Sequence, residues 1–307
     1  MATRRFTAFN GRRMRVTRVD ACGRPIYGTG AQVVTSGFVS IGMSGEVREG
    51  TDIELVNASG DLCLSERGAD QLRWLTVEAA FCEVDPDLVS LFQPNNTKLV
   101  DYQGNVIGFA ESDTQNLSVG VAIEVWANVA GADLCDDPNA EETFAYFLLP
   151  WVVGGTMGDL TIENAGLTTT INSRTKRNGK WGVGPYDVML EALNTPGPML
   201  APVGAREHRR VFLTTIAPPE ETIGAVGLSN PDGPAYTLVE GATPLTSTVT
   251  TALTGQSVNW GDGSPPEALT AATAKNHVYT AGTYEVSVYA TIDPSDVTVK
   301  SHTVPWP

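Results

Sequence analysis

The glycine-rich turns of this chain are the first residues to test for chemistry, and their spacing does not match any catalytic pattern. Gly28-Thr29-Gly30 lacks the third glycine of a dinucleotide-binding fingerprint, in which the backbone must approach a pyrophosphate closely. Gly42-Met43-Ser44-Gly45 is one residue short of the GxSxG turn that exposes a nucleophilic serine, and no helix is predicted after it. The sequence also contains no Walker loop. These turns therefore do not predict nucleotide chemistry or acyl transfer.

The titratable side chains are equally uninformative about catalysis. The chain has three histidines, and His208 lies in the polar run 206–210, where we expect a solvated side chain. Glu141 and Glu142 are adjacent, so they point apart in a strand or a helix and cannot form an acid–base pair. We therefore predict that the protein is not an enzyme.

Metal and cofactor sites are also not expected. An acidic loop leaves a calcium site open, although its spacing fits no EF-hand; it comprises Asp133, Cys135, Asp136 and Asp137. The four cysteines are scattered without CxxC spacing, so we expect buried free thiols, leave a disulfide open and disfavour zinc; they are Cys22, Cys63, Cys82 and Cys135. Our prediction is no cofactor and no metal.

Charge is distributed very unevenly along the 307 residues. The net charge is −15, yet residues 1–24 carry seven arginines and one acidic residue. A basic N-terminal arm on an acidic body could dock on an identical neighbour, remain solvated, or bind nucleic acid. Docking on a neighbour is favoured, because no recognition helix or aromatic–basic interleaving follows. The candidate self-assembly residues are Arg4, Arg5, Arg12, Arg13 and Arg15.

Hydrophobic periodicity predicts a mainly β protein. Alternation and turn residues indicate strands near 13–19, 32–43, 52–56, 73–81, 121–129, 143–151 and 210–216. A turn at 57–60 should close the third, and the strand at 143–151 is apolar almost throughout, as expected for a strand covered on both sides. In these strands we expect Val39, Ile41 and Met43 to share one face, and Leu75, Val77, Ala79 and Phe81 another; Val121, Ile123, Val125, Ala127 and Val129 should point inward. Residues 187–193 fit a short helix or a strand equally well.

A single helix is expected at 85–92. Asp85 suits the N-cap, Pro86 the first helical position, and Asp87 the positive end of the helix dipole. Leu88, Leu91 and Phe92 recur at helical spacing, so the helix should lie on a sheet.

The paired prolines in 217–221 predict an extended linker, and the residues after it form a second module. Strands are expected at 236–239, 247–253, 256–260, 283–292 and 296–304, enough for a small sandwich. The strand at 283–292 alternates as a half-buried strand does, with one face made of Tyr284, Val286, Val288, Ala290 and Ile292. The predicted organisation is a first domain at 1–216, a linker at 217–230 and a second domain at 231–307.

The second domain resembles the PKD-type immunoglobulin-like family. The resemblance rests on the ordered pattern WGDGS, HxY and GxYxVxV, here Trp260 to Ser264, His277 to Tyr279 and Gly282 to Val288. Its key residues are Trp260, Asp262, His277, Tyr279, Gly282 and Tyr284. Such domains bind or space other molecules and rarely catalyse.

The first two thirds resemble the major tail tube proteins of long-tailed phages, particularly those that infect actinobacteria. The resemblance is carried by Arg15-Val16-Thr17-Arg18-Val19-Asp20-Ala21-Cys22-Gly23-Arg24-Pro25, by residues 37–41, 57–64 and 81–92, and by Trp181-Gly182-Val183-Gly184-Pro185-Tyr186-Asp187-Val188. It covers roughly residues 5–216 and depends on the order of these segments.

The resemblance implies a β-sandwich or barrel with a flanking helix that assembles into stacked six-membered rings. Its implied partners are copies of itself, a tape measure protein, a tail terminator, and DNA that passes through the lumen without specific binding. The immunoglobulin-like domain would project outward from a phage tail assembled in the host cytoplasm, with a host-surface glycan as one target. No membrane span and no secretory signal are predicted.

Two other functions remain open. One is a secreted or surface-displayed adhesin or polysaccharide-binding protein, a frequent setting for PKD-like domains. The other is nucleic-acid binding by the arginine-rich arm alone.

Overall fold

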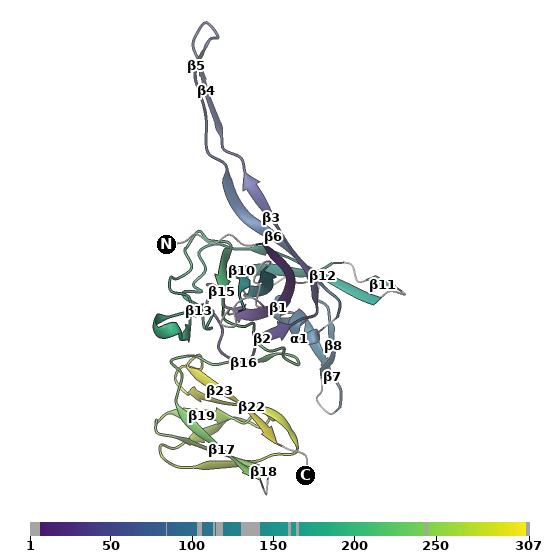
Figure 1. The fold of residues 1–307 in the computed structure, drawn as a ribbon, viewed down its shortest axis with the longest axis vertical. Helices are drawn as coiled ribbons and strands as arrows, with labels where there is room; N and C mark the ends of the chain where they lie inside the picture. The colour runs from purple at the N-terminus through teal and green to yellow at the C-terminus, as the bar shows by residue number, and fades with distance from the viewer. Residues whose placement is uncertain are drawn as a thin grey trace, which may run out of the picture.

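The computed structural model describes residues 7–83, 85–102, 106–112, 114, 119–129, 142–158, 161–163, 166–242 and 245–304. The fold is mainly β, as predicted, with antiparallel sheets and one short α-helix among these residues (Figure 1). The strands of the first module are β1 (Ala8–Val19), β2 (Gly28–Thr35), β3 (Phe38–Arg48), β4 (Asp52–Val56), β5 (Leu62–Arg67), β6 (Gln71–Phe81), β7 (Thr97–Val100), β8 (Val106–Ala110), β9 (Gly120–Val129), β10 (Phe144–Met157), β11 (Thr161–Glu163), β12 (Gly166–Thr175), β13 (Met189–Leu190), β14 (Pro196–Gly197), β15 (Arg210–Thr214) and β16 (Val226–Leu228).

Ten of these strands form one large sheet. Its order is β16-β2-β1-β9-β10-β12-β6-β3, with β15 added beside β10 and β11 beside β12. The long strand β10 pairs with β9 and β15 through its first half and with β12 through its second half. Register shifts lie between Leu149 and Val152 in the pairing with β9 and between Val153 and Thr156 in the pairing with β12. Such irregularities bend a strand, so one sheet can curl around a core.

The central strands are buried on both faces. On one face of β9, Val121, Ile123 and Val125 join a core with β1, β6 and the helix; on the other, Ala122 and Trp126 join a second core. The expectation that residues 143–151 are covered on both sides is confirmed for β10. The alternation predicted for β9 identified one buried face, and the second was missed because it carries the charged Glu124, which is buried as well.

The helix α1 (Pro86–Phe92) begins as predicted. The Asp85 carboxylate accepts a hydrogen bond from the Asp87 N–H at 2.8 Å, and Pro86 occupies the first turn. Leu88, Leu91 and Phe92 pack into the first core, which confirms that the helix lies on the sheet.

The single strand expected at 32–43 is wrong, because the chain turns at Ser36-Gly37 between β2 and β3. The Thr35 hydroxyl accepts a hydrogen bond from the Gly37 N–H at 2.9 Å. A β-bulge follows, so Val39 is 61% exposed while Ile41 and Met43 pack against the core. A bulge adds one residue to a strand, which moves Val39 off the face it was expected to share. The expected buried face of β6, Leu75 to Phe81, is confirmed.

Residues 176–209 cover the second core with little regular structure. Trp181, Val188 and Met199 from this segment pack against Trp126 and Tyr146 of the sheet. The undecided stretch 187–193 contains β13, paired with β14, and then the 3-10 helix η1 (Ala192–Asn194).

The second module is a two-sheet sandwich, as expected. Its strands are β17 (Tyr236–Ala242), β18 (Leu245–Thr251), β19 (Gln256–Asn259), β20 (Glu267–Leu269), β21 (Lys275–Val278), β22 (Gly282–Ala290) and β23 (Val297–Val304). The sheets have the orders β17-β18-β21 and β20-β19-β22-β23. Val258, Trp260, Val286 and Val288 are fully buried between them. Ile292, expected on this inner face, lies beyond β22 and is 97% exposed.

The segment expected to be a linker, 217–230, is bound along the first module. The Thr222 N–H donates to the Val34 carbonyl at 3.0 Å, and the Ala225 N–H donates to the Asp87 carboxylate at 3.0 Å. Strand β16 then pairs with β2, so β15 is not the last strand of the large sheet. The Pro-rich start of the segment predicted extended backbone but gave no sign of this pairing.

Candidate functional site

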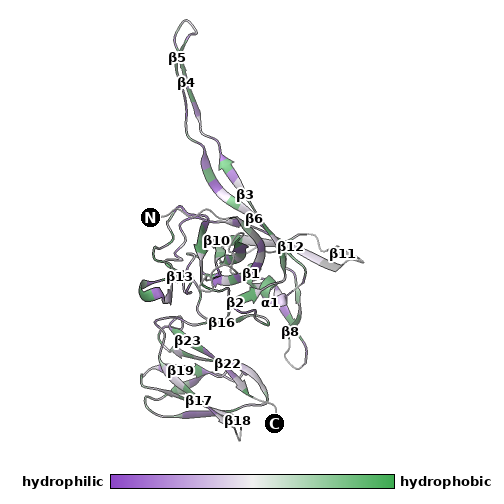
Figure 2. Cartoon of the chain, viewed as in Figure 1, coloured by the Kyte–Doolittle hydropathy of each residue, from purple (hydrophilic) through white to green (hydrophobic). Residues whose placement is uncertain are grey.

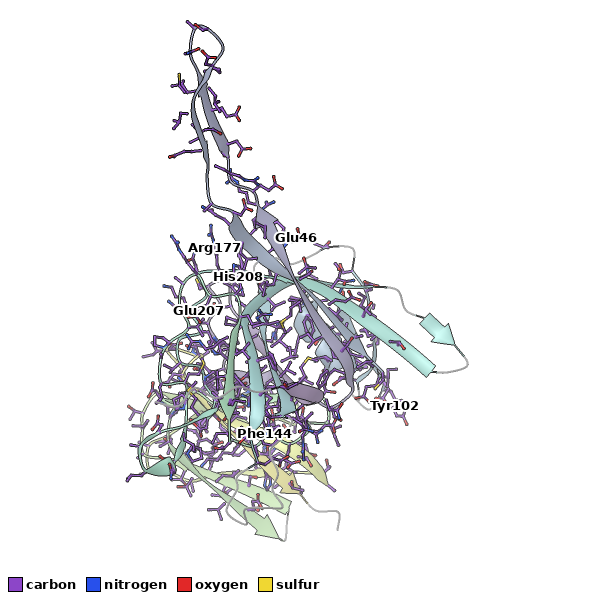
Figure 3. The ribbon with its side chains drawn as sticks, turned by 45° about the horizontal axis from the view of Figure 1, so that its top comes forward. Glu46, Tyr102, Phe144, Arg177, Glu207 and His208 are labelled. Atoms are coloured by element: carbon purple, nitrogen blue, oxygen red, sulfur yellow. The ribbon has the colours of Figure 1, made fainter. Side chains whose placement is uncertain are left out.

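A two-stranded arm, residues 46–73, projects from the first module at the end opposite the C-terminal sandwich (Figure 1). It consists of the outer ends of β3 and β6 continued by β4 and β5, with Glu46 at its root (Figure 3). The strand at 52–56 and the turn at 57–60 were predicted, and the Asn57 N–H bonds to the Asp61 carbonyl across this turn. No sequence pattern indicated that this hairpin stands away from the core.

Apolar residues follow one another along the arm, interspersed with hydrophilic ones (Figure 2). Each of the following is 43–60% exposed: Val47, Ile53, Leu55, Val56, Leu62, Leu64 and Leu72. Leu55 pairs with Leu64 and Val56 with Leu62, so apolar residues occupy both faces near the tip. An isolated two-stranded hairpin is marginally stable in water, so a partner surface is expected to cover the arm.

The large sheet also has an open edge. Strand β3 pairs only with β6 among the described residues and is the last strand in the sheet order. Unpaired N–H and C=O groups on such an edge can hydrogen-bond to a strand of another chain. The arm and this edge are continuous, because β3 forms part of both.

The arginines predicted to mediate self-assembly have different environments. Arg4 and Arg5 lie outside the described residues. The exposed side chain of Arg12 donates to Glu142 at 3.0 Å, and Arg13 donates to the Arg12 carbonyl at 3.1 Å. Arg15 is buried inside its own chain, so the proposal of contacts between copies rests on the other four arginines.

Arg15 forms a buried ion pair with Glu124. Two guanidinium nitrogens lie 2.6 and 2.7 Å from the carboxylate, and the Tyr146 hydroxyl donates to the same carboxylate. Burial by itself would lower the pKa of Arg15, but Glu124 raises it above its ordinary value. Burial, together with Glu124, raises the pKa of the Tyr146 hydroxyl. Both effects keep Arg15 charged and Tyr146 neutral, which suits a structural pair rather than a proton-transfer site.

A chain of hydrogen bonds runs from the neighbourhood of this pair to the C-terminal sandwich. The guanidinium of Arg15 stacks on the Tyr186 ring at 3.3 Å, and the Tyr186 hydroxyl donates to the Gln32 amide oxygen at 2.8 Å. The Gln32 amide donates to the Gly227 carbonyl at 3.1 Å, and the Gly227 N–H donates to the Glu285 carboxylate at 2.7 Å. We call the contacts from Tyr186 to Glu285 the interdomain chain.

Close approach at Gly227 explains why glycine is needed there. A Cβ at this position would lie 2.6 Å from a Val299 methyl group. Next to it, the Ser229 hydroxyl donates to the Val299 carbonyl at 3.0 Å, and the Asn230 N–H donates to the Val297 carbonyl at 2.8 Å. The C-terminal sandwich is therefore held against the first module by specific contacts.

The residues of the PKD-like pattern meet in one cluster of the sandwich. Trp260 is fully buried and stacks on His277 with ring centroids 4.9 Å apart. The His277 Nε2 lies 2.7 Å from the Asp262 carboxylate, and the Tyr279 hydroxyl donates to the Trp260 carbonyl at 3.1 Å. Tyr284, two residues after Gly282, stacks on Tyr279 at 4.5 Å.

This cluster is structural rather than catalytic in its geometry. Partial burial would raise the pKa of Asp262, but hydrogen bonds from Ser264 and His277 lower it to about 2. A carboxylate that is already ionised and doubly bonded is a poor general base at neutral pH. The cluster fixes the 260–264 turn to β21 and β22.

Two sequence expectations about single residues are wrong. His208 is only 7% exposed: its Nδ1 lies 2.8 Å from the Thr175 hydroxyl, and Arg177 is near it (Figure 3). Burial and then the charge of Arg177 lower its pKa, so it is neutral. The adjacent charges predicted solvation, but residues 176–209 fold back over the sheet and carry His208 with them. Cys22, Cys63 and Cys82 are free but exposed, because they lie in a turn, on the arm and after a strand end.

The remaining candidates form no recognisable site within the part of the chain that the structure describes. Gly42 to Gly45 lies within the extended strand β3, and the acidic loop 133–137 and Glu141 lie outside the described residues. Within the described part of the chain, no group of three or more His, Cys, Asp or Glu side chains could hold a metal ion. No described helix is long and apolar enough to cross a membrane.

No family model and no curated protein matches this chain. The tail-tube and PKD-like assignments are therefore resemblances that rest on the residues quoted above.

Proposed function

We propose that this protein is a structural subunit of a phage tail tube. In this proposal, copies associate into six-membered rings, the rings stack, and the genome passes along the central channel. The C-terminal sandwich lies outside the tube as an accessory binding domain, with a host-surface glycan as one target. Tape measure and tail terminator proteins are the expected partners at the ends of the tube.

The observation that carries the proposal is the projecting arm, which is apolar on both faces and continuous with an open sheet edge. Such a surface promotes aggregation of a monomer, whereas in an assembly it forms contacts between subunits. A ring of copies can hydrogen-bond the edge of β3, and the arm can pack on a neighbouring copy. The acidic body fits the same role, since a lumen of net negative charge repels phosphates and lets DNA slide.

Negative-stain microscopy with sedimentation velocity tests this proposal directly. We expect rings or tubes of uniform width that grow with protein concentration. A protein that remains monomeric at every concentration and binds polysaccharide would favour the adhesin instead. A salt-dependent shift of duplex DNA by the monomer would favour nucleic-acid binding.

The outer position of the sandwich can be tested by truncation. A chain ending after Asn230 keeps β16 on the edge of β2, so it should still form tubes, of smaller diameter. A chain ending after Pro219 also loses β16 and serves as the comparison, because it uncovers β2. Loss of tubes in the longer truncation would refute the accessory role of the sandwich.

A further inference from the structure

A cleft of about 980 Å³ lies between the two modules. The start of β2 and residues 221–223 and 225–226 line one side, and residues of the 259–264 turn, β22 and β23 line the other. The interdomain chain holds these two walls together through Gly227 and Glu285. Clefts between domains are common binding sites.

The polar lining of this cleft is suited to a cation. Glu221 and Glu285 both line it, and no lining residue is lysine or arginine. One Glu221 oxygen accepts both bonds from Ser36, and one Glu285 oxygen accepts the bond from Gly227. The second oxygen of each carboxylate has lone pairs for a further donor. A guanidinium offers paired N–H donors that match carboxylates.

The cleft also has an apolar wall. Ile223 is fully exposed, and Ala225 and Val226 lie beside it. Arginine side chains bury their aliphatic stems on such surfaces while the charged group bonds elsewhere. An occupant that combines arginine with an apolar side chain would use both parts of the lining.

We propose that this cleft receives the N-terminal segment of a second copy, with Arg4 and Arg5 paired to Glu285 and Glu221. The segment 1–6 reads Met-Ala-Thr-Arg-Arg-Phe, which contains two arginines, no acidic residue and one aromatic residue. Arg12 and Arg15 further along the chain already have carboxylate partners of their own.

At the Glu285 end of the cleft, strand direction favours a second copy over the same chain, whereas Glu221 lies beside Ser36 and close to the charge of Arg13. Gln32, next to Gly227 and Glu285, is paired with Thr17, and β1 begins nine residues earlier at Ala8. Nine strand residues cover about 30 Å along the strand. Arg4 precedes Ala8 by four residues, which extend at most about 14 Å. The contact would join different surfaces of two copies, and such head-to-tail contacts build open stacks. This inference rests on the proposed self-assembly and specifies one of its contacts.

Fluorescence anisotropy with a labelled peptide of residues 1–7 tests the inference on the full-length protein. We expect saturable binding at 50 mM NaCl that weakens at least tenfold at 500 mM NaCl. The double variant Glu221→Gln, Glu285→Gln should bind at least tenfold more weakly, and a peptide with Arg4→Gln and Arg5→Gln should not bind. The variant Glu267→Gln is the matched control, because this partly exposed carboxylate pairs with Lys275 outside the cleft.

Two outcomes would overturn the inference. One is equal peptide affinity for the double variant and the wild type; the other is no binding at low salt. Microscopy of the same samples separates this result from the larger proposal. Tubes formed by a protein that does not bind the peptide would refute the cleft contact alone, whereas peptide binding without any tube would refute the tail-tube function.

Discussion

Removing the apolar side chains of the arm should abolish self-association and leave the fold intact. Ile53, Leu55 and Leu64 are 56%, 60% and 44% exposed, so none supports the core of the monomer. The triple variant Ile53→Thr, Leu55→Thr, Leu64→Thr keeps residues that favour strands while removing apolar surface. Substitutions on such surfaces change monomer stability by at most about 0.5 kcal/mol each.

The expected effect on association follows from the area still exposed. Full burial of a leucine or isoleucine stabilises by about 1.5–3 kcal/mol, and roughly half of each side chain is already covered within the arm. Covering the remainder in an interface contributes about 1 kcal/mol per residue, or about 3 kcal/mol for the three. The triple variant should therefore associate roughly 100-fold more weakly at each arm contact.

Sedimentation velocity over a 1000-fold concentration range measures this change, and thermal unfolding of the same samples checks the fold. The control is Leu253→Thr with Ile292→Thr, two exposed apolar residues of the C-terminal sandwich. We expect the control to assemble like the wild type. Unchanged association of the arm variant would contradict the argument that the arm is an assembly surface.

Three further changes probe the polar contacts. Glu124→Ala leaves Arg15 buried without its partner, so denaturant unfolding should show a loss of about 3–5 kcal/mol; a loss below about 1 kcal/mol would mean that water replaces the carboxylate. Asp262→Asn should remove a pH dependence of unfolding. In the wild type the pKa of Asp262 is lowered to about 2, so the carboxylate stabilises the fold above the ordinary pKa of aspartate, and this stabilisation is lost as pH falls toward 2. Melting temperatures that change in parallel for the variant and the wild type between pH 2 and 5 would contradict this. Glu285→Gln should keep the hydrogen bond from the Gly227 N–H, because an amide oxygen can accept it. Burial raises the pKa of Glu285, so the free energy of unfolding of the wild type falls as pH rises through that pKa. The variant should not show this fall. The rate of protease cleavage within 217–226, as a function of pH, is compared among the wild type, Glu285→Gln and Glu285→Ala. Equal rates for the three proteins would count against the interdomain chain.

The parts of the fold that could be predicted from the sequence are those set by local patterns. The N-cap at Asp85, the alternation from Leu75 to Phe81 and the turn at 57–60 each depend on a few adjacent residues. The pattern from Trp260 to Tyr284 also predicted a strand-rich module, because its alternation is local. These elements were confirmed, since no distant contact opposes their local preference.

What was missed depends on distant partners. The apolar residues of 52–56 look like any half-buried strand, and the pattern does not show whether another element of the chain covers them. Likewise, the charges around His208 indicated solvent, and only the return of residues 176–209 over Trp126 buries this histidine. The pairing of Arg15 with Glu124 spans 109 positions, so neither residue identifies the other in the sequence.

Strand β16 both covers one edge of the large sheet and contacts the C-terminal sandwich. It covers the edge of β2, and its Gly227 bonds to Gln32 on one side and Glu285 on the other. The sheet is therefore closed at this edge by the chain itself and open at β3, where the arm begins. A sheet of this kind favours addition of a neighbour at β3, because this edge strand has 11 residues whereas β16 at the other end of the order has 3. The sandwich, held at the closed edge, would leave the arm and the open edge clear for other copies.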